Sequence, residues 1–118
     1  FRQGMLVSVP IQLRALPGSP AVSDMVEVWR AHYAGARFVE VTGAADAAAM
    51  KELVPEDLNG SNTLRLFAFG SEDGTQAVLV AQLDNLGKGA SGAAVQNLNL
   101  VLGLDEGEGL STPFSEAA

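Results

Sequence analysis

The feature that most constrains this chain is a strand that runs through a glycine-rich loop directly into a helix, over residues 84–104. Before it, Gln76–Leu83 is an alternating apolar run of the kind that forms a strand. The loop that follows holds one lysine, Lys88, and glycines at positions 87, 89 and 92. The fold must therefore bring the end of a strand close to the start of a helix, with the glycine loop between them.

The helix of this stretch is indicated by apolar residues at helical spacing, which are Ala94, Val95, Leu98, Val101 and Leu102. Ser91 is a candidate N-cap, and Gly103 is a candidate C-terminal stop. A loop of this kind aims backbone N–H groups and the positive helix end at one place. We therefore expect a phosphate or another anion to suit it.

The loop also contains the pattern G-x-G-x-x-G, at Gly87, Gly89 and Gly92. A dinucleotide fingerprint needs a second strand and an acidic residue about 20 positions further on. Here residues 105–118 are acidic and poor in apolar side chains, so we do not expect a complete Rossmann unit. Two alternatives remain open: a loop that contributes to a cofactor site shared with another domain, and a flexible turn whose glycines only permit tight packing.

Composition limits the possible partners. The 118 residues are enough for one domain, with 47% apolar residues. Seven basic and fourteen acidic residues give a net charge of −7, which argues against a nucleic-acid or anionic-membrane surface. The chain has no cysteine, no apolar run of transmembrane length and no signal-peptide pattern, which fits a cytoplasmic protein. Because it starts at Phe1 within a strand-like pattern, we expect it to be part of a longer protein.

The remaining patterns predict an α+β fold with a mainly antiparallel or mixed sheet and helices on one face. Pro10 lies inside the first strand, so that strand should be at an edge or bulged. Ser19 is expected to cap the first helix, with Pro20 at its first position. The expected strands cover residues 5–13, 38–41, 63–69 and 76–83, and the expected helices cover residues 20–33, 44–53 and 91–103. We assign residues 1–104 to the domain and residues 105–118 to an acidic tail.

Candidate chemistry within the chain is sparse. His32 is the only histidine, and without a second histidine or a cysteine it predicts neither a metal site nor a nucleophile pair. The last helix contains the polar residues Gln96, Asn97 and Asn99. Asn97 lies near its apolar side, where a buried amide would need a partner, and a ligand amide is one candidate. Residues 59–62, Asn-Gly-Ser-Asn, read either as an ordinary turn or as part of a site.

The segment from Asp84 to Leu100, with the later pairs Gly103-Leu104 and Gly109-Leu110, closely resembles the C-terminal signature of the N-acetyl-gamma-glutamyl-phosphate reductase family. The start, Phe1-Arg2-Gln3-Gly4-Met5-Leu6, is similar to that family's arginine-glycine entry into its catalytic-domain strand. Leu58–Asn62 is similar to its Gly-Ser/Thr-Asn loop. The resemblance spans nearly the whole chain.

The resemblance implies a glyceraldehyde-3-phosphate-dehydrogenase-like C-terminal domain. It also implies an enzyme of arginine biosynthesis that reduces N-acetylglutamyl phosphate to the semialdehyde with NADPH, through a cysteine thioester and a histidine acid/base. Neither catalytic group is expected in this chain, so the domain alone should be inactive. The implied cofactor contacts are Asn85, Lys88 and Gly89, and the implied substrate contacts are Arg2 and Asn62. NADP would be shared with a Rossmann domain of the same parent chain, and subunits would associate through the sheet.

A second hypothesis of another class remains open, namely a free-standing α+β binding or assembly module without catalysis. A longer parent with an upstream Rossmann domain and a cysteine would favour the reductase. A start codon directly before Phe1 would favour the module.

Overall fold

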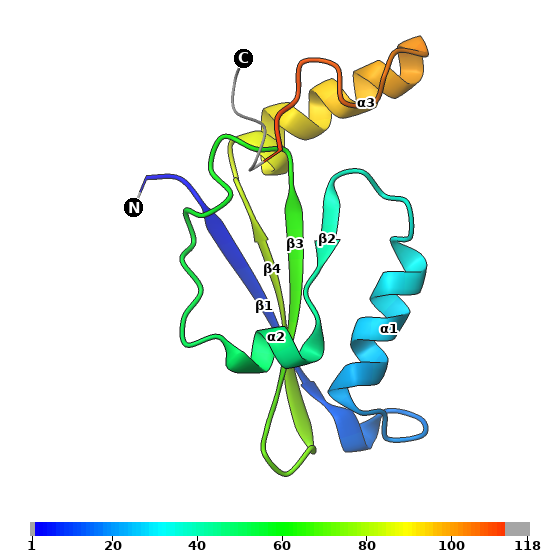
Figure 1. Ribbon diagram of the computed structural model, residues 1–118, viewed down its shortest axis with the longest axis vertical. Helices are drawn as coiled ribbons and strands as arrows, with labels where there is room; N and C mark the ends of the chain where they lie inside the picture. The colour runs from blue at the N-terminus through cyan, green and yellow to red at the C-terminus, as the bar shows by residue number, and fades with distance from the viewer. Residues whose placement is uncertain (1, 113–118) are drawn as a thin grey trace. The chain divides into compact units, whose positions relative to one another are not determined.

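The computed structural model describes residues 2–112, whose order of elements is shown in Figure 1. The strands are β1 (Met5–Gln12), β2 (Val39–Val41), β3 (Leu64–Gly70) and β4 (Gln76–Leu83), and the α-helices are α1 (Val22–His32), α2 (Ala44–Ala49) and α3 (Gly92–Leu102). A 3₁₀ turn, Leu13–Ala15, follows β1, and a π-helical turn, Gly87–Ser91, precedes α3. In the part of the chain that the structure describes, no helix is long and apolar enough to cross a membrane.

The strands pair in the order β1-β4-β3-β2 within one sheet. β3 and β4 form an antiparallel hairpin, closed by a hydrogen bond of 2.9 Å from the N–H of Ser71 to the carbonyl of Gln76. In Figure 1, β2 runs in the same direction as β3, so the sheet is mixed. β1 is an edge strand, as Pro10 predicted, because a residue without an N–H cannot donate to a second neighbouring strand.

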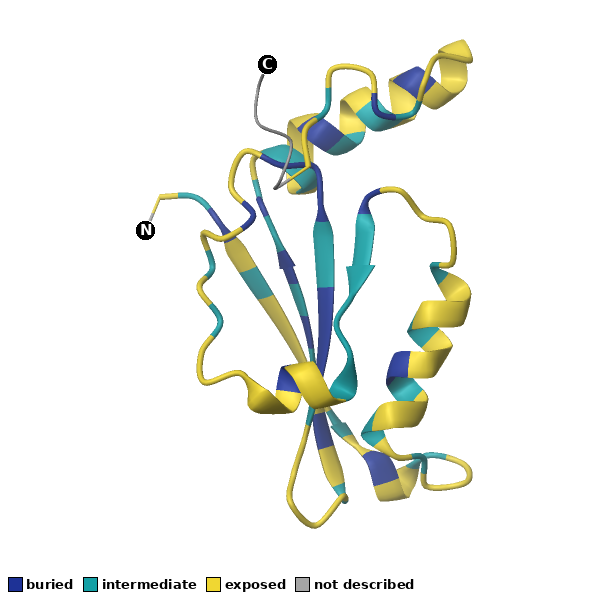
Figure 2. Cartoon of the chain, in the orientation of Figure 1, coloured by how far each residue is buried: buried dark blue, intermediate teal, exposed yellow. Residues whose placement is uncertain are grey.

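The chain divides into two compact units. Among the described residues, the first comprises residues 2–6, 54–64 and 82–112, and the second comprises residues 7–53 and 65–81. Most of the buried apolar side chains belong to the second unit: Leu13, Val26, Phe38, Ala47, Leu66, Phe67, Ala68, Ala77 and Val80. This unit therefore holds the hydrophobic core, whereas the first unit relies on polar contacts. Figure 2 shows the buried residues along the strands and their connections.

In the second unit, α1 and α2 contact each other, and α1 also contacts β2. A pocket of about 610 Å³ is lined by α1, α2 and β3 together, through residues that include Val22, Ala47 and Ala68. Both helices therefore lie on one face of this part of the sheet. The α+β prediction is confirmed.

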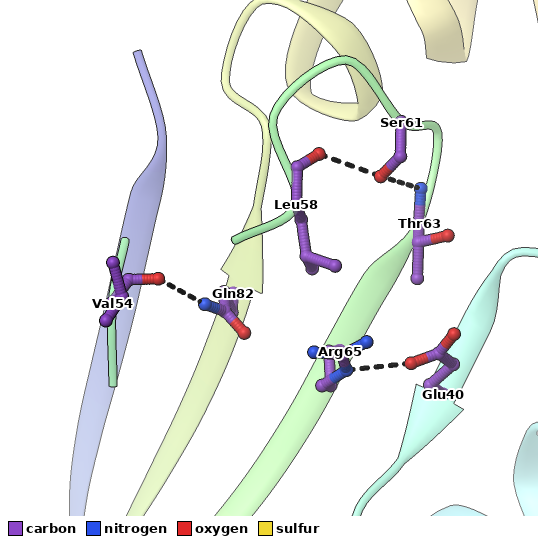
Figure 3. Close-up of polar contacts among 7 residues, drawn as sticks. All are labelled: Glu40, Val54, Leu58, Ser61, Thr63, Arg65 and Gln82. Carbon is purple, nitrogen blue, oxygen red and sulfur yellow. Dashed lines mark hydrogen bonds and ion pairs between the residues drawn. The ribbon is translucent and has the colours of Figure 1, made fainter. Parts of the chain in front are cut away.

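Figure 3 shows side-chain contacts from each of the two units. In the second unit, Arg65 Nε donates to Glu40 Oε2 at 2.7 Å, which links β3 to β2. In the first unit, Gln82 Nε2 donates to the carbonyl of Val54 at 2.6 Å, and Ser61 Oγ donates to the carbonyl of Leu58 at 2.8 Å. The buried amide of Gln82 thus has a hydrogen-bond partner, and it ties β4 to the segment between α2 and β3, which contains Val54.

The predicted start of α1 is wrong, whereas Ser91 does occupy the N-cap position of α3 but without a side-chain cap. Ser19 does not cap α1; its φ is +43°, and the start of the helix is closed instead by Asp24, whose carboxylate accepts the N–H of Ala21 at 2.8 Å. Ser91 makes no side-chain cap to α3, because it has helical backbone angles itself. Its hydroxyl donates back to the carbonyl of Leu86 at 2.8 Å. The predicted stop at Gly103 is confirmed by its left-handed φ of +68°.

Candidate functional site

The three segments that carry the resemblance come together in the first unit. Their parts at the site are residues 2–4 of the start, residues 59–62 of the second segment and residues 84–92 of the third. Together with residues 109–111 they line a pocket of about 320 Å³, to which Gln3, Asn62 and Gly92 contribute. Segments that are far apart in sequence thus line one small cavity with polar groups, which makes it a candidate ligand site.

Asp84 is the centre of this arrangement, and its side chain is 1% exposed. One carboxylate oxygen, Oδ2, accepts from Gln3 Nε2 at 2.6 Å and from the N–H of Gly60 at 2.8 Å. The other, Oδ1, accepts the N–H of Leu86 at 2.9 Å. Burial alone raises the pKa of Asp84, but these donors and the N–H of Gly87 outweigh it, so the pKa is lowered.

Asn85 reinforces the same junction. Its Oδ1 accepts the N–H of Gly4 at 2.7 Å. Gly4 has a φ of +105°, and a Cβ there would overlap the carbonyl oxygen of Pro55, so only glycine fits this close approach. The predicted contact residue Asn85 therefore fixes the backbone beside Arg2, and Arg2 itself is exposed.

The glycine loop is not an open nest of N–H groups. It winds into the π-helical turn Gly87–Ser91, which continues into α3 without a break. The N–H of Gly89 donates to the carbonyl of Asp84 at 2.8 Å, and the N–H of Ser91 donates to the carbonyl of Leu86 at 3.2 Å. The expectation that this loop aims its N–H groups at an anion is corrected, because the chain itself uses them.

Lys88 and Asn62, which were predicted separately, are joined through Gln96. The Oε1 atom of Gln96 accepts from Lys88 Nζ at 2.6 Å and from Asn62 Nδ2 at 2.9 Å. Its Nε2 atom donates to Glu106 Oε1 at 2.7 Å. Burial lowers the pKa of Lys88, and the charge of Glu106 acts in the opposite direction.

Asn62 carries an unusual buried acceptor. The residue is 2% exposed, and its Oδ1 has no hydrogen-bond partner among the described residues. Its backbone N–H donates to the carbonyl of Ser111 at 2.8 Å, so the side chain is held at the pocket from two sides. A buried amide oxygen without a donor is costly, and this one packs against Gly92 of α3.

The polarity of α3 is the reverse of what its apolar spacing predicted. The inward residues are Gly92, Gln96 and Asn99, and Asn97 is exposed, so the expectation for Asn97 is wrong. Asn99 Nδ2 donates to the carbonyls of Glu106 and Glu108 at 3.2 and 2.9 Å. The apolar side is exposed, most of all at Val101 (82%), and Figure 2 shows the helix as largely exposed.

Sequence reasoning therefore missed Asp84 and Gln3 as organising residues. It did single out Gln96 and Asn99, and both have hydrogen-bond partners within the unit. The available signal was a second set of residues at helical spacing, the glycines and amides at positions 92, 96, 99 and 103. This set fits the helical repeat as well as the apolar set does. His32 is exposed on α1 and packs edge-on against Tyr33. Across residues 2–112, no group of histidine and carboxylate side chains is placed to hold a metal ion.

The acidic tail is described as far as residue 112, and it contacts α3 through the carbonyls of Glu106 and Glu108. The rest of the predicted tail, residues 113–118, lies outside the described residues. The division at residue 104 stays a prediction.

Comparison with known proteins places these features in a family. The family described as semialdehyde dehydrogenase, dimerisation domain, matches residues 1–85. The N-acetyl-gamma-glutamyl-phosphate reductase of Burkholderia ambifaria is 53% identical over 104 residues, which is 88% of this chain and 33% of that relative. The proteins of that name from Brucella ovis and Brucella abortus are 52% identical over 103 residues, 87% of this chain and 33% of each relative. The chain spans about a third of the length of these curated relatives, and the resemblance stated from its motifs is confirmed.

Proposed function

Because the chain belongs to the semialdehyde dehydrogenase dimerisation-domain family, we propose that it is the substrate and dimerisation domain of an N-acetyl-gamma-glutamyl-phosphate reductase. The parent enzyme reduces N-acetylglutamyl phosphate to N-acetylglutamate semialdehyde with NADPH in arginine biosynthesis. The observation that carries the proposal is the 52–53% identity to reductases over 87–88% of the chain. Without a cysteine, this domain does not perform the reaction alone.

The substrate side of the proposed site consists of Arg2 and Asn62. N-acetylglutamyl phosphate carries an amide N–H and a carboxylate. Asn62 lines the pocket on the substrate side, and the exposed guanidinium of Arg2 is a suitable partner for the carboxylate. The role of these two residues is to bind and orient the substrate, and the catalytic cysteine comes from elsewhere in the parent.

The cofactor side consists of Asn85, Lys88 and Gly89. The donor set fits a nicotinamide nucleotide in part: Asn85 presents an amide group, Lys88 a cation, and the exposed Gly89 permits close approach of a ring to the backbone. NADPH, when bound, supplies hydride to the acyl carbon. The phosphates of the nucleotide belong to the Rossmann domain, because this chain is acidic and its one loop lysine already binds Gln96.

Two partner surfaces follow from the same proposal. The exposed apolar side of α3, formed by Val95, Leu98, Val101 and Leu102, is the surface that the Rossmann domain of the parent covers. The edge strand β1 exposes Val7 and Val9, which fits association of two subunits through the sheet. We place the parent in the cytoplasm, with no nucleic-acid or membrane partner.

The alternative is a non-catalytic α+β binding or assembly module. The observation that favours it is the same exposed apolar helix, which could bind a separate protein as well as a domain of the same chain. The two hypotheses differ in whether the full-length protein turns over an acyl phosphate.

The deciding experiment measures the reverse reaction of the full-length protein that carries this chain. N-acetylglutamate semialdehyde, phosphate and NADP⁺ are mixed with the protein, and the absorbance of NADPH is followed as the acyl phosphate forms. We expect turnover by the parent. In Lys88→Ala we expect kcat/KM to fall at least tenfold, because the variant loses a hydrogen bond of the lysine ammonium group, and a charged hydrogen bond contributes about 1.5–3 kcal/mol.

Lys51→Ala is the matched control, because Lys51 is an exposed lysine of the second unit. Full activity in both variants would retain the reductase but reject the role of Lys88. An inactive wild-type parent would reject the reductase and favour the binding module.

A further inference from the structure

The carboxylate of Asp84 joins three segments of the first unit, and each segment carries a proposed site residue. Gln3 is next to Arg2, Gly60 is two residues before Asn62, and Leu86 lies within the proposed cofactor loop. The contacts span 81 and 24 residues of sequence, so they fix tertiary structure and not a local turn.

The chemistry of the junction requires an ionised carboxylate. All the donors that approach Asp84 are N–H groups, from the Gln3 amide and from the backbone of Gly60, Leu86 and Gly87. A carboxylate accepts at both oxygens and donates nothing, so it matches such a set. An asparagine of the same shape would turn its own NH₂ group toward N–H donors and lose at least one of the links.

The fit is also tight. A Cβ at Gly87 would lie 2.9 Å from Asp84 Oδ2 and 2.9 Å from the carbonyl oxygen of Ser61. The glycine of the loop is therefore required for the carboxylate to reach segment 59–62.

We propose that Asp84 is a positioning residue of the reductase site, which sets the places of Arg2, Asn62 and the 85–92 loop relative to one another through its hydrogen bonds to Gln3, Gly60 and Leu86. This inference rests on the proposed function for its catalytic consequence. Asp84 itself does not touch substrate. It acts by pre-orienting the groups that do, and misplacing such groups by about 1 Å costs about a hundredfold in rate.

The test uses the full-length protein and two independent readouts. The first is amide hydrogen exchange of segments 2–4 and 59–62, which reports positioning whether or not the protein is a reductase. Because hydrogen bonds to charged groups are among the stronger ones, we expect exchange to speed up roughly tenfold to hundredfold in Asp84→Asn. Unchanged exchange in these segments would overturn the proposal.

The matched control is Asp73→Asn. Asp73 is also a carboxylate that accepts several hydrogen bonds, from Ser71 and Thr75, but it lies in the β3–β4 turn of the second unit. Its substitution should leave exchange in segments 2–4 and 59–62, and the reductase kinetics, unchanged.

The second readout is kinetic. In Asp84→Asn we expect kcat/KM to fall at least tenfold, with both a raised KM for the semialdehyde and a lowered kcat. Kinetics within twofold of wild type, in a folded variant with faster exchange, would reject the catalytic consequence. If the wild type has no reductase activity, the proposed function fails, and exchange alone decides the positioning role.

Gln3→Ala covers the case in which Asp84→Asn does not fold. It removes one of the three links and leaves the backbone donors of Gly60 and Leu86 in place. We expect a three- to tenfold rise in the semialdehyde KM and faster exchange at residues 2–4 only. A normal KM and normal exchange in this variant would overturn the proposal.

Discussion

Replacing Gly92 with alanine tests the packing of the site at its tightest point. Gly92 is the first residue of α3 and has an ordinary helical φ of −63°, so alanine is conformationally allowed. A Cβ at this position would overlap Asn62 Oδ1 and would lie 2.9 Å from the carbonyl carbon and oxygen of Gly87. Helix propensity and packing therefore predict opposite signs for the same substitution.

The magnitudes decide which effect wins. Alanine in place of glycine in a helix stabilises by about 1 kcal/mol. Overpacking costs about 1–3 kcal/mol, and moving the buried Asn62 would also weaken its bond to Gln96, which is worth about 1 kcal/mol. The Gly87 contact is backbone and cannot swing away. We expect a net local destabilisation of about 1–3 kcal/mol.

Amide hydrogen exchange in the full-length protein measures this locally, without assuming that the whole chain unfolds in one step. The amides of α3 should exchange about 5- to 150-fold faster in Gly92→Ala. Ala94→Gly, at an exposed position of the same helix, gives the propensity effect alone, about 1 kcal/mol of destabilisation. If Gly92→Ala slowed exchange instead, propensity would outweigh packing and the close approach of Asn62 to α3 would be refuted.

Two further predictions concern the second unit. Phe67→Ala removes a ring that is 1% exposed and stacked on Phe69. We expect the free energy of unfolding to fall by about 3–5 kcal/mol, measured as a lower thermal midpoint. A fall of less than about 1 kcal/mol would contradict the place of Phe67 in the core. The hydrogen bonds from Ser71 and Thr75 lower the pKa of Asp73 from 3.8 to about 2, so its contribution to stability is complete above pH 3.8 and is lost as the pH falls toward 2. The difference in thermal midpoint between wild type and Asp73→Asn should therefore be constant above about pH 5, fall between pH 5 and pH 2, and be lost as the pH drops below about 2. A difference that grows on acidification would contradict this sign.

Much of the fold could be predicted from sequence because its strands and helices follow the spacing of apolar residues and the position of proline. Strand β4 has the predicted bounds, and Pro10 correctly indicated an edge strand. On α1, the residues at helical spacing, Val22, Val26 and Trp29, are the less exposed ones. The cap of α1 was missed because a capping prediction depends on backbone angles, and the left-handed backbone at Ser19 could not be predicted from the pattern of side chains.

The site was predicted in its parts but not in its connections. Apolar spacing on α3 was read as an inward face, yet that face is exposed, since the polar residues Gln96 and Asn99 are the ones with partners inside the unit. Periodicity identifies the two sides of a helix and cannot tell which of them the same unit covers. The role of Asp84 depends on donors 24 and 81 residues away, and such contacts leave no trace in local spacing.

The π-helical turn Gly87–Ser91 has a consequence for how this region tolerates changes in length. A π turn is an α-helix with one residue inserted, so deleting a residue between Gly87 and Ser91 would let the segment wind as a regular α-helix. Every residue of α3 would then rotate by about 100° about the helix axis. Gln96 would turn away from Asn62 and Lys88, and no single side-chain substitution could restore the register. The five-residue spacing of Gly87 and Gly92 is thus as much a part of the site as any side chain in it.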